Sequence, residues 1–300
     1  MGIPRGSARL LLEEARRRPF RGALLELGKM QVFFGADELA RWAQQHRVAL
    51  AEVPQLSLSA DPRLAAQGCL SDRSFFSLLG FDEVTSADIS RWEGADVTWD
   101  FNQPAPAELH QRFDAVYEGG TLQHVFDLPQ ALENVFQVLK PGGRVIHGMS
   151  PSSNHVDHGF YMFSPTFFAD YYAANGFTIE KFYFFDYVPY WIDGRFYSTR
   201  WRIRPYRPGC LDHLSYGRWG GRQTGLFVVA TKGENATGHV RPQQGAYRAV
   251  WRQEGERQAV ETPVAGRTRP ASRLLRLWKL AREILRRWGP KRLPPVVARY

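Results

Sequence analysis

Hydrophobic positions in the chain form short apolar runs that alternate with helical patterns. The run at 23–27 is closed by Gly28, as is typical of a buried parallel strand. In residues 128–139 the apolar positions recur at the 3.6-residue spacing of a helix. Strands are predicted over 23–27, 83–89, 95–99, 113–117, 144–147, 177–188 and 225–231, and helices over 37–47, 71–79, 128–139 and 164–176. This alternation predicts an α/β, doubly wound, mostly parallel sheet.

The composition changes towards both ends of the chain, which predicts four segments. Residues 1–22 are expected to form a basic N-terminal helix, and residues 23–233 the α/β domain, with an insert at 192–223 rich in Arg and aromatic residues. That insert either binds sugars, phosphates or acidic groups, or packs on the core as a lid. Gly, Gln, Pro, Arg and Glu predominate in 234–270, which is interpreted as a flexible linker. Residues 271–300 are expected to form a basic amphipathic helix, at 271–288, and a tail.

The formal charge of +9 is concentrated at the two ends. Residues 267–300 contain 11 basic residues and one acidic residue, and residues 1–22 contain six Arg and two Glu. The intervening body contains 22 basic and 27 acidic residues, so it is mildly acidic. Because a nucleic-acid footprint should lie on the folded body, this distribution argues against nucleic acid as the main partner.

Hydrophobic and cysteine content set further limits. With 44% hydrophobic residues, the chain can bury a large core. Its two cysteines, Cys69 and Cys210, are too few for a disulfide framework or a four-cysteine zinc site. Since no run of 18 apolar residues occurs, no transmembrane helix is predicted. These features favour a cytoplasmic protein, with the C-terminal helix placing it on the inner face of a membrane.

The polar residues that follow the predicted strands are candidates for a binding site. In open parallel sheets, ligands bind outside the carboxyl ends of the strands. An acid after the second strand can accept hydrogen bonds from a ribose, and a glycine after the first lets the backbone approach a ligand. The strand-end residues are Glu26, Gly28, Asp88, Ile89, Asp100, Phe101, Glu118 and Gly119.

Residues 113–145 resemble class I S-adenosylmethionine-dependent methyltransferases, from their fourth strand to their fifth. The matching segments are Phe113–Val125, Ala131–Leu132 and Val138–Val145, the last of which contains the Leu-Lys-Pro-Gly-Gly turn. Residues 25–28 resemble the start of the family's first motif, and Asp88 and Asp100–Phe101 resemble its ribose and adenine contacts. The resemblance extends over roughly residues 20–233. It implies a seven-stranded Rossmann-like sheet with an antiparallel last strand, and S-adenosylmethionine as cofactor.

The first motif departs from the family pattern. Where the family continues Gly-x-Gly-x-Gly, this chain has Lys29-Met30-Gln31-Val32-Phe33-Phe34 after Gly28. Asp88 follows Glu26 by 62 positions, which is about double the usual spacing. Either a rebuilt loop holds the cofactor, or the site has lost it and the chain is a non-catalytic binding module. Side chains of Met30, Phe33 or Phe34 filling the cleft beside Gly28 would favour the second hypothesis.

Four histidines lie near the expected acceptor site: His124, His147, His155 and His158. Transfer to a hydroxyl requires removal of a proton, and imidazole titrates near neutral pH. His147 lies inside a strand and is interpreted as a core residue. His158 is the preferred candidate base, with His124 second. His155, Asp157 and His158 could bind a metal ion, but the sequence shows no further ligand pattern, so no metal is predicted.

The C-terminal helix at 271–288 allows three interpretations. Its basic residues and apolar stripe suit an anionic membrane surface. The stripe also suits docking on the domain or on a second subunit, and the polybasic tail suits nucleic acid. Together these patterns predict methyl transfer to a hydroxyl of a small-molecule, glycan-type or lipid-linked acceptor at a membrane surface.

Overall fold

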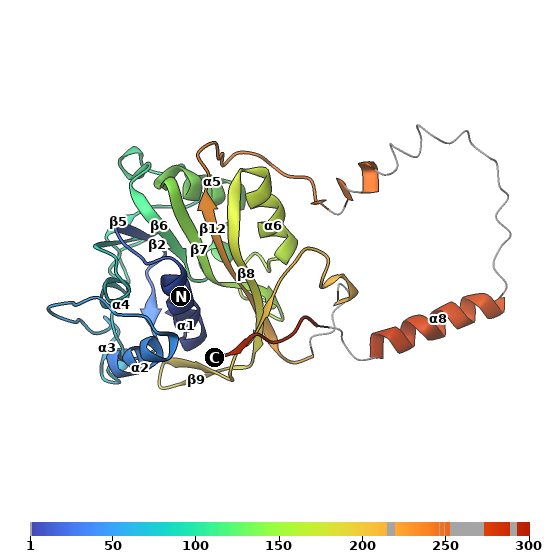
Figure 1. Ribbon diagram of the computed structural model, residues 1–300, viewed down its shortest axis with the longest axis horizontal. Coiled ribbons are helices and arrows are strands. Elements are labelled where there is room, and N and C mark those ends of the chain that lie inside the picture. The colour runs from blue at the N-terminus through green and yellow to red at the C-terminus, as the bar shows by residue number, and fades with distance from the viewer. Residues whose placement is uncertain (1, 215–219, 246, 249, 253–272, 289–292) are drawn as a thin grey trace.

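The chain forms a three-layer α/β/α domain with appended segments, seen in a computed structural model (Figure 1). The structure describes residues 2–214, 220–245, 247–248, 250–252, 273–288 and 293–300. The helices are α1 (Arg5–Arg17), α2 (Ala36–His46), α3 (Pro62–Ala65), α4 (Asp72–Leu78), η1 (Ala107–Leu109), η2 (Leu122–His124), α5 (Leu128–Val138), α6 (Pro165–Ala174), η3 (Asp212–Leu214) and α8 (Arg273–Trp288). The strands are β1 (Gly2–Ile3), β2 (Ala23–Leu27), β3 (Gln31–Val32), β4 (Glu83–Asp88), β5 (Val97–Thr98), β6 (Phe113–Glu118), β7 (Leu139–Ser153), β8 (Phe177–Tyr187), β9 (Pro189–Ile192), β10 (Arg195–Ser198), β11 (Arg202–Pro205), β12 (Gln223–Lys232) and β13 (Ala298–Arg299).

The central sheet has the order β13-β11-β8-β12-β7-β6-β2-β4-β5. Within it, β2 pairs in parallel with β4 and β6, and β6 pairs in parallel with β7. β12 runs antiparallel to both β7 and β8. The seven strands from β8 to β5 therefore confirm the predicted sheet, including its antiparallel last strand. β11 and β13 extend it at the β8 edge.

Apolar residues of the sheet alternate between two cores. One core contains Leu24, Tyr117 and Phe185 beneath α1, α2 and α4. The other contains Leu25, Val116 and Phe184 beneath α5 and α6. Because successive strand residues point to opposite faces, this alternation lets a single sheet carry both helical layers.

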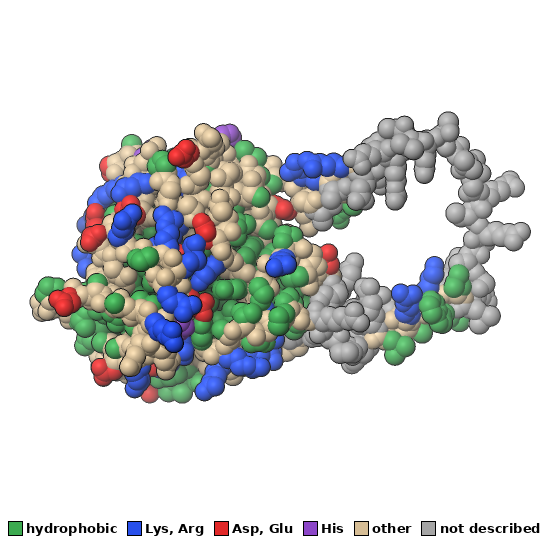
Figure 2. Space-filling model, viewed as in Figure 1, with side chains coloured by type: hydrophobic (Ala, Val, Ile, Leu, Met, Phe, Trp, Pro, Cys, Tyr) green, Lys and Arg blue, Asp and Glu red, His purple; other side chains and the backbone are tan. Residues whose placement is uncertain are grey.

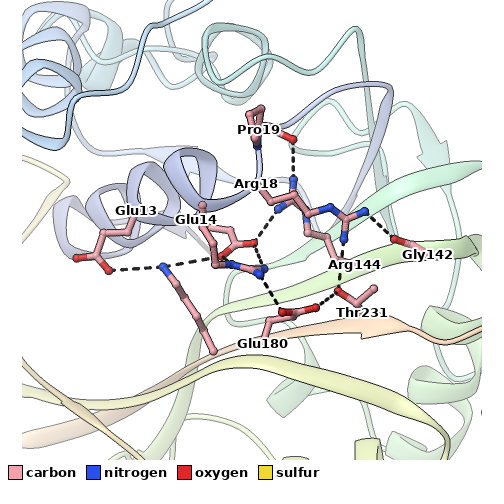
Figure 3. Close-up of polar contacts among 10 residues, drawn as sticks. Glu13, Glu14, Arg18, Pro19, Gly142, Arg144, Glu180 and Thr231 are labelled. Atoms are coloured by element: carbon pink, nitrogen blue, oxygen red, sulfur yellow. Dashed lines mark hydrogen bonds and ion pairs between the residues drawn. The ribbon is translucent and has the colours of Figure 1, made fainter.

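The N-terminal helix belongs to the domain, which differs from the predicted separate segment at 1–22. Leu10, Leu11 and Leu12 of α1 are buried in the first core. The fully buried Glu14 accepts hydrogen bonds from Arg17 and from Arg144 of β7, each at 2.7 Å (Figure 3). Burial lowers the pKa of Arg144 to about 10, although Glu14 opposes this shift. Buried ion pairs of this kind join α1 to the sheet.

Two other predicted segments also join the domain in part. The last residues, expected as a tail, form β13, and Tyr300 exchanges backbone hydrogen bonds with Trp201. In the predicted linker, Gly238 and Val240 accept hydrogen bonds from Tyr171 and Asn175. The described start of the predicted linker therefore lies along α6. Residues 253–272, most of which were also predicted as linker, lie outside the described residues.

The insert at 192–223 packs mainly against the core. Trp201 is fully buried and stacks on Phe185 with ring centroids 3.8 Å apart. Arg202, Arg204 and Arg222 surround the buried Asp186 carboxylate. The described part of the insert thus favours the core-packing interpretation. Figure 2 shows Lys/Arg and Asp/Glu side chains interspersed over one face of the domain, which fits a body without a uniform basic footprint.

Candidate functional site

The carboxyl ends of β2, β4 and β6 meet at one edge of the sheet. Gly28 follows β2 with φ +82°, and its N–H donates to the Ala87 carbonyl of β4 at 2.7 Å. On the other side, the Thr121 hydroxyl donates to the Leu27 carbonyl and ties β6 to β2. A glycine takes this left-handed conformation without strain, so the chain turns sharply here.

The loop after Gly28 is held in place from two sides. The Lys29 N–H donates to Asp88 Oδ2 at 2.9 Å, so the predicted ribose-binding carboxylate also fixes this loop. β3 pairs in parallel with β1, which brings the N-terminal residues over the loop. A methyl group at Gly2 would lie 2.2 Å from the Phe33 ring, which shows how closely the two strands approach.

The bulky residues that replace the glycines are buried. Phe34 packs edge-to-face on Phe75, and Phe33 packs on Trp191. Met30 is only 3% exposed, and a methyl group at Gly119 would lie 2.7 Å from its sulfur. Phe34 is therefore a core residue, whereas Met30 packs against the strand end at Gly119.

Two cavities flank this loop. A cavity of about 1000 Å³ is lined by Lys29–Gln31 and by segments 57–63, 70–73 and 91–96. A second cavity, of about 480 Å³, is lined by Gln31 and Phe33 together with Gly119–Gly120 and 154–158. Gln31 lines both cavities. Space for ligands is thus present on both sides of the altered loop, with Met30 and Gln31 between the two cavities.

Glu26 lies behind the loop and is fully buried. Burial raises the pKa of Glu26 well above its usual range, and the neighbouring Asp72 raises it further. Such a group is costly to bury without a partner.

Glu118 was predicted to contact the cofactor, but the structure gives its carboxylate another role. Its Oε1 accepts the N–H groups of Gly120 and Thr121 at 2.6 and 2.5 Å. Its Oε2 pairs with His147 Nδ1 at 3.0 Å and accepts from the Ser150 hydroxyl. These partners lower the pKa of Glu118 against the effect of burial. Because both oxygens are used, Glu118 shapes the turn after β6.

The other strand-end residues lie at the same edge in varied environments. Ile89 is 65% exposed directly after Asp88. Asp100 Oδ1 accepts from the backbone and side chain of Asn102, and Phe101 is buried in the second core. Ile89 is therefore accessible to a ligand, whereas Phe101 packs in the second core shortly after the end of β5.

The predicted bases lie together in the 480 Å³ cavity. His124, His155 and His158 all line it, and the rings of His124 and His158 are 5.4 Å apart. His155 Nε2 lies 3.1 Å from the Thr224 carbonyl, and burial lowers its pKa to about 4. Burial and the nearby His158 lower the pKa of His124. His147 is fully buried between Glu118 and Tyr172, away from this group.

Sequence reasoning missed Lys29 and Asp72 as site residues. They form an ion pair in the larger cavity, although they are 43 positions apart. The signal for Asp72 was its position after Ser71 at the start of α4, which indicated only a helix cap.

Among the described residues, no group of three or more His, Cys, Asp or Glu is placed to hold a metal. No described helix has the length and apolarity needed to cross a membrane.

Strand order and sequence comparison both indicate a methyltransferase-type fold. The sheet is that of class I S-adenosylmethionine-dependent methyltransferases, and the family described as "Methyltransferase domain" matches residues 74–145. Demethylmenaquinone methyltransferase of Symbiobacterium thermophilum is 37% identical over 57 residues, which cover 18% of this chain and 23% of that protein. The chain thus matches about a quarter of the length of this curated relative.

Solved methyltransferase-like structures align over most of the chain at low identity. The YcgJ protein of Bacillus subtilis is 14% identical, with 76% of this chain and 98% of that chain covered and a TM-score of 0.38. An S-adenosylmethionine-dependent methyltransferase of Mesorhizobium loti is 16% identical, with 76% and 99% covered and a TM-score of 0.34.

Proposed function

We propose that the chain is an enzyme that transfers a methyl group from S-adenosylmethionine to an acceptor. The observation that carries this proposal is the pair of cavities at the carboxyl ends of β2, β4 and β6, with Gln31 lining both. Ligands of parallel α/β sheets bind at this edge. The methyltransferase-type sheet and the matching family support the same reaction.

The residues at this edge fit the cofactor. Gly28 lets the ligand approach the backbone, and Ile89 presents an exposed apolar surface for the adenine. We assign Asp88 to the ribose. The Glu26 carboxyl group is buried behind this edge. Met30 lies between the two cavities, and its unbranched thioether can adopt other rotamers. Gly119 lines the smaller cavity, and Asp100 lies at the same edge above the buried Phe101.

His158 and His124 supply the proton-transfer chemistry in this proposal. When bound, the cofactor supplies a methyl group activated by a positively charged sulfur. An acceptor hydroxyl must lose its proton as it attacks, and a neutral imidazole removes it. Since the pKa of His124 is lowered, its ring is neutral at pH 7. We assign His158 as the base, and His124 as the second candidate for that role.

The lining of the 480 Å³ cavity favours an acceptor with an apolar part. Val156 and Trp191 line this cavity, and they are 82% and 62% exposed. Trp191 packs edge-to-face on Phe33, with ring centroids 5.7 Å apart. Exposed apolar residues gathered at a cavity are typical of ligand-binding surfaces. A small-molecule or glycan-type hydroxyl carried on a lipid fits this arrangement.

Helix α8 supports attachment to an anionic membrane. Residues 273–288 include six basic residues and one acidic residue. Leu277, Trp278 and Leu285 are 62%, 57% and 72% exposed. Apolar side chains can enter the headgroup region while basic residues bind anionic lipids. A surface-bound enzyme would meet a lipid-linked acceptor directly.

Transfer of a labelled methyl group from S-adenosylmethionine tests the proposed reaction. The protein is incubated with fractions of polar and lipid-linked hydroxyl compounds, and labelled product is counted. We expect transfer that falls about 10²- to 10⁴-fold in His158→Asn. His239→Asn, the same substitution at an exposed histidine that lines neither cavity, serves as the matched control and should keep activity. Absence of labelled product from every fraction would contradict the proposal.

A further inference from the structure

The Lys29–Asp72 ion pair is a built feature of the larger cavity. Lys29 comes from the loop after β2, and Asp72 begins α4 in the long segment between α2 and β4. Their side chains are 17% and 6% exposed, and both residues line the 1000 Å³ cavity. The extra residues between Glu26 and Asp88 therefore bring a carboxylate to the altered loop.

Glu26 completes this group from behind. It is fully buried, and its carboxyl group lies beside that of Asp72, whose charge and hydrogen bond raise the pKa of Glu26. Asp96 is the next acid, and it pairs with Arg73 at 3.0 Å. The group thus offers one ammonium donor, Lys29, beside two carboxyl groups.

These charges match those of an α-amino acid. Its carboxylate can bind the Lys29 ammonium, and its ammonium can bind the Asp72 carboxylate, with the Glu26 carboxyl group behind it. Burying the Lys29 and Asp72 charges is costly because both lose water. A ligand that carries one positive and one negative charge gives each of them an opposite charge to bind. The cavity volume leaves room for a nucleoside beyond the amino-acid end.

We propose that Lys29, Asp72 and Glu26 bind the amino-acid end of the methyl donor, in place of the missing glycine-rich loop. This inference rests on the proposed function and deepens it. The segment that contains Asp72 lengthens the spacing between Glu26 and Asp88, and in doing so it rebuilds the cofactor site. Lys29 and Asp72 are then binding residues that determine specificity for a donor with an amino-acid end.

Two ligands that differ at this end test the proposal. S-adenosylhomocysteine carries the amino-acid end, whereas 5′-methylthioadenosine has only a methyl group there. Calorimetric titration of the full chain is expected to show that Asp72→Asn and Lys29→Gln weaken S-adenosylhomocysteine binding at least tenfold. Binding of 5′-methylthioadenosine should change less than twofold, which also shows that the variants are folded.

Asp37→Asn is the matched control. Asp37 is exposed in the first turn of α2 and lines neither cavity, so this variant should bind both ligands as the parent does. Equal weakening of both ligands, or no weakening, would overturn the inference and leave the proposed function standing. The same holds if the parent protein binds both ligands equally well. If the parent binds neither ligand, the proposed function fails together with it.

Discussion

Glu14 is the residue that joins the N-terminal helix to the sheet. Its carboxylate is fully buried and accepts from Arg17 and from the buried Arg144 (Figure 3). Glu14 compensates for the cost of burying the Arg144 charge only while both partners of the ion pair are present. Where charged residues of α1 face the sheet, they therefore stabilise the fold by forming ion pairs with it.

Glu14→Ala should destabilise the protein by about 3–5 kcal/mol, because it leaves the buried Arg144 unpaired. Chemical denaturation followed by circular dichroism measures this change. Glu180→Ala is the control: Glu180 is 26% exposed and pairs with Arg17, so its loss should cost less than about 1 kcal/mol. Similar values for the two variants would contradict the assignment of Glu14 as the buried partner.

His155 should make stability depend on pH. Burial lowers its pKa to about 4, below the ordinary value of 6.5. The unfolded chain then binds the proton more tightly, so the contribution of His155 to stability is lost as the pH falls from about 6.5 to about 4. From the size of this shift, the loss is on the order of 3 kcal/mol. His155→Gln should flatten the pH dependence of unfolding over this interval, and an unchanged slope would rule out a buried neutral His155.

At the scale of elements, the pairing of β1 with β3 fixes the loop that replaces the glycine-rich motif. Each strand has only two residues, and they pair in parallel. Ile3 of β1 and Val32 of β3 are both buried in the first core. The N-terminal residues therefore help to hold the loop in place.

Gly2→Val should separate β1 from β3, because a side chain at Gly2 would overlap the Phe33 ring. Hydrogen exchange in peptides covering 28–36 should then become at least tenfold faster, while peptides of β6 keep their protection. Gly221→Val is the control, since a methyl group there meets no atom within 4 Å. Unchanged exchange at 28–36 would show that the loop does not depend on β1.

Sequence periodicity predicted the strands of the central sheet but not the details of the site. Buried runs such as 23–27 and 113–117 carry a local signal, so the sheet and its edge could be inferred. The pairing of β1 with β3, and of Lys29 with Asp72, joins positions far apart in sequence that have no periodic pattern. The contact of Glu118 with His147 could not be predicted, because His147 lies on the next strand. Glu118 as a cofactor contact, and His158 and His124 as bases, stay predictions.

For the whole molecule, the basic surplus lies apart from the mildly acidic body. The domain surface carries both signs, whereas α8 is strongly basic (Figure 2). Both described ends of the chain contribute to the domain: β1 lies over the site loop, and β13 extends the sheet. The basic surplus is thus available for a partner other than the acceptor.

Vesicle sedimentation tests the role of α8. The full protein should sediment with vesicles that contain anionic lipid and remain in solution with neutral vesicles. Trp278→Ser combined with Leu285→Ser should reduce binding at least tenfold, whereas the exposed Ile192→Ser, outside α8, should not. Equal sedimentation with neutral and anionic vesicles, or no effect of the double variant, would contradict membrane attachment through α8.

Calorimetric titration of the full chain with S-adenosylmethionine tests the central claim most directly. We expect saturable binding of one cofactor per chain, weakened at least tenfold in Asp88→Ala, because we propose Asp88 as the ribose ligand and because it also accepts the Lys29 N–H. Absence of binding, or binding unaffected by Asp88→Ala, would contradict the account. Absence of binding would favour the alternative that this methyltransferase fold is a non-catalytic binding module.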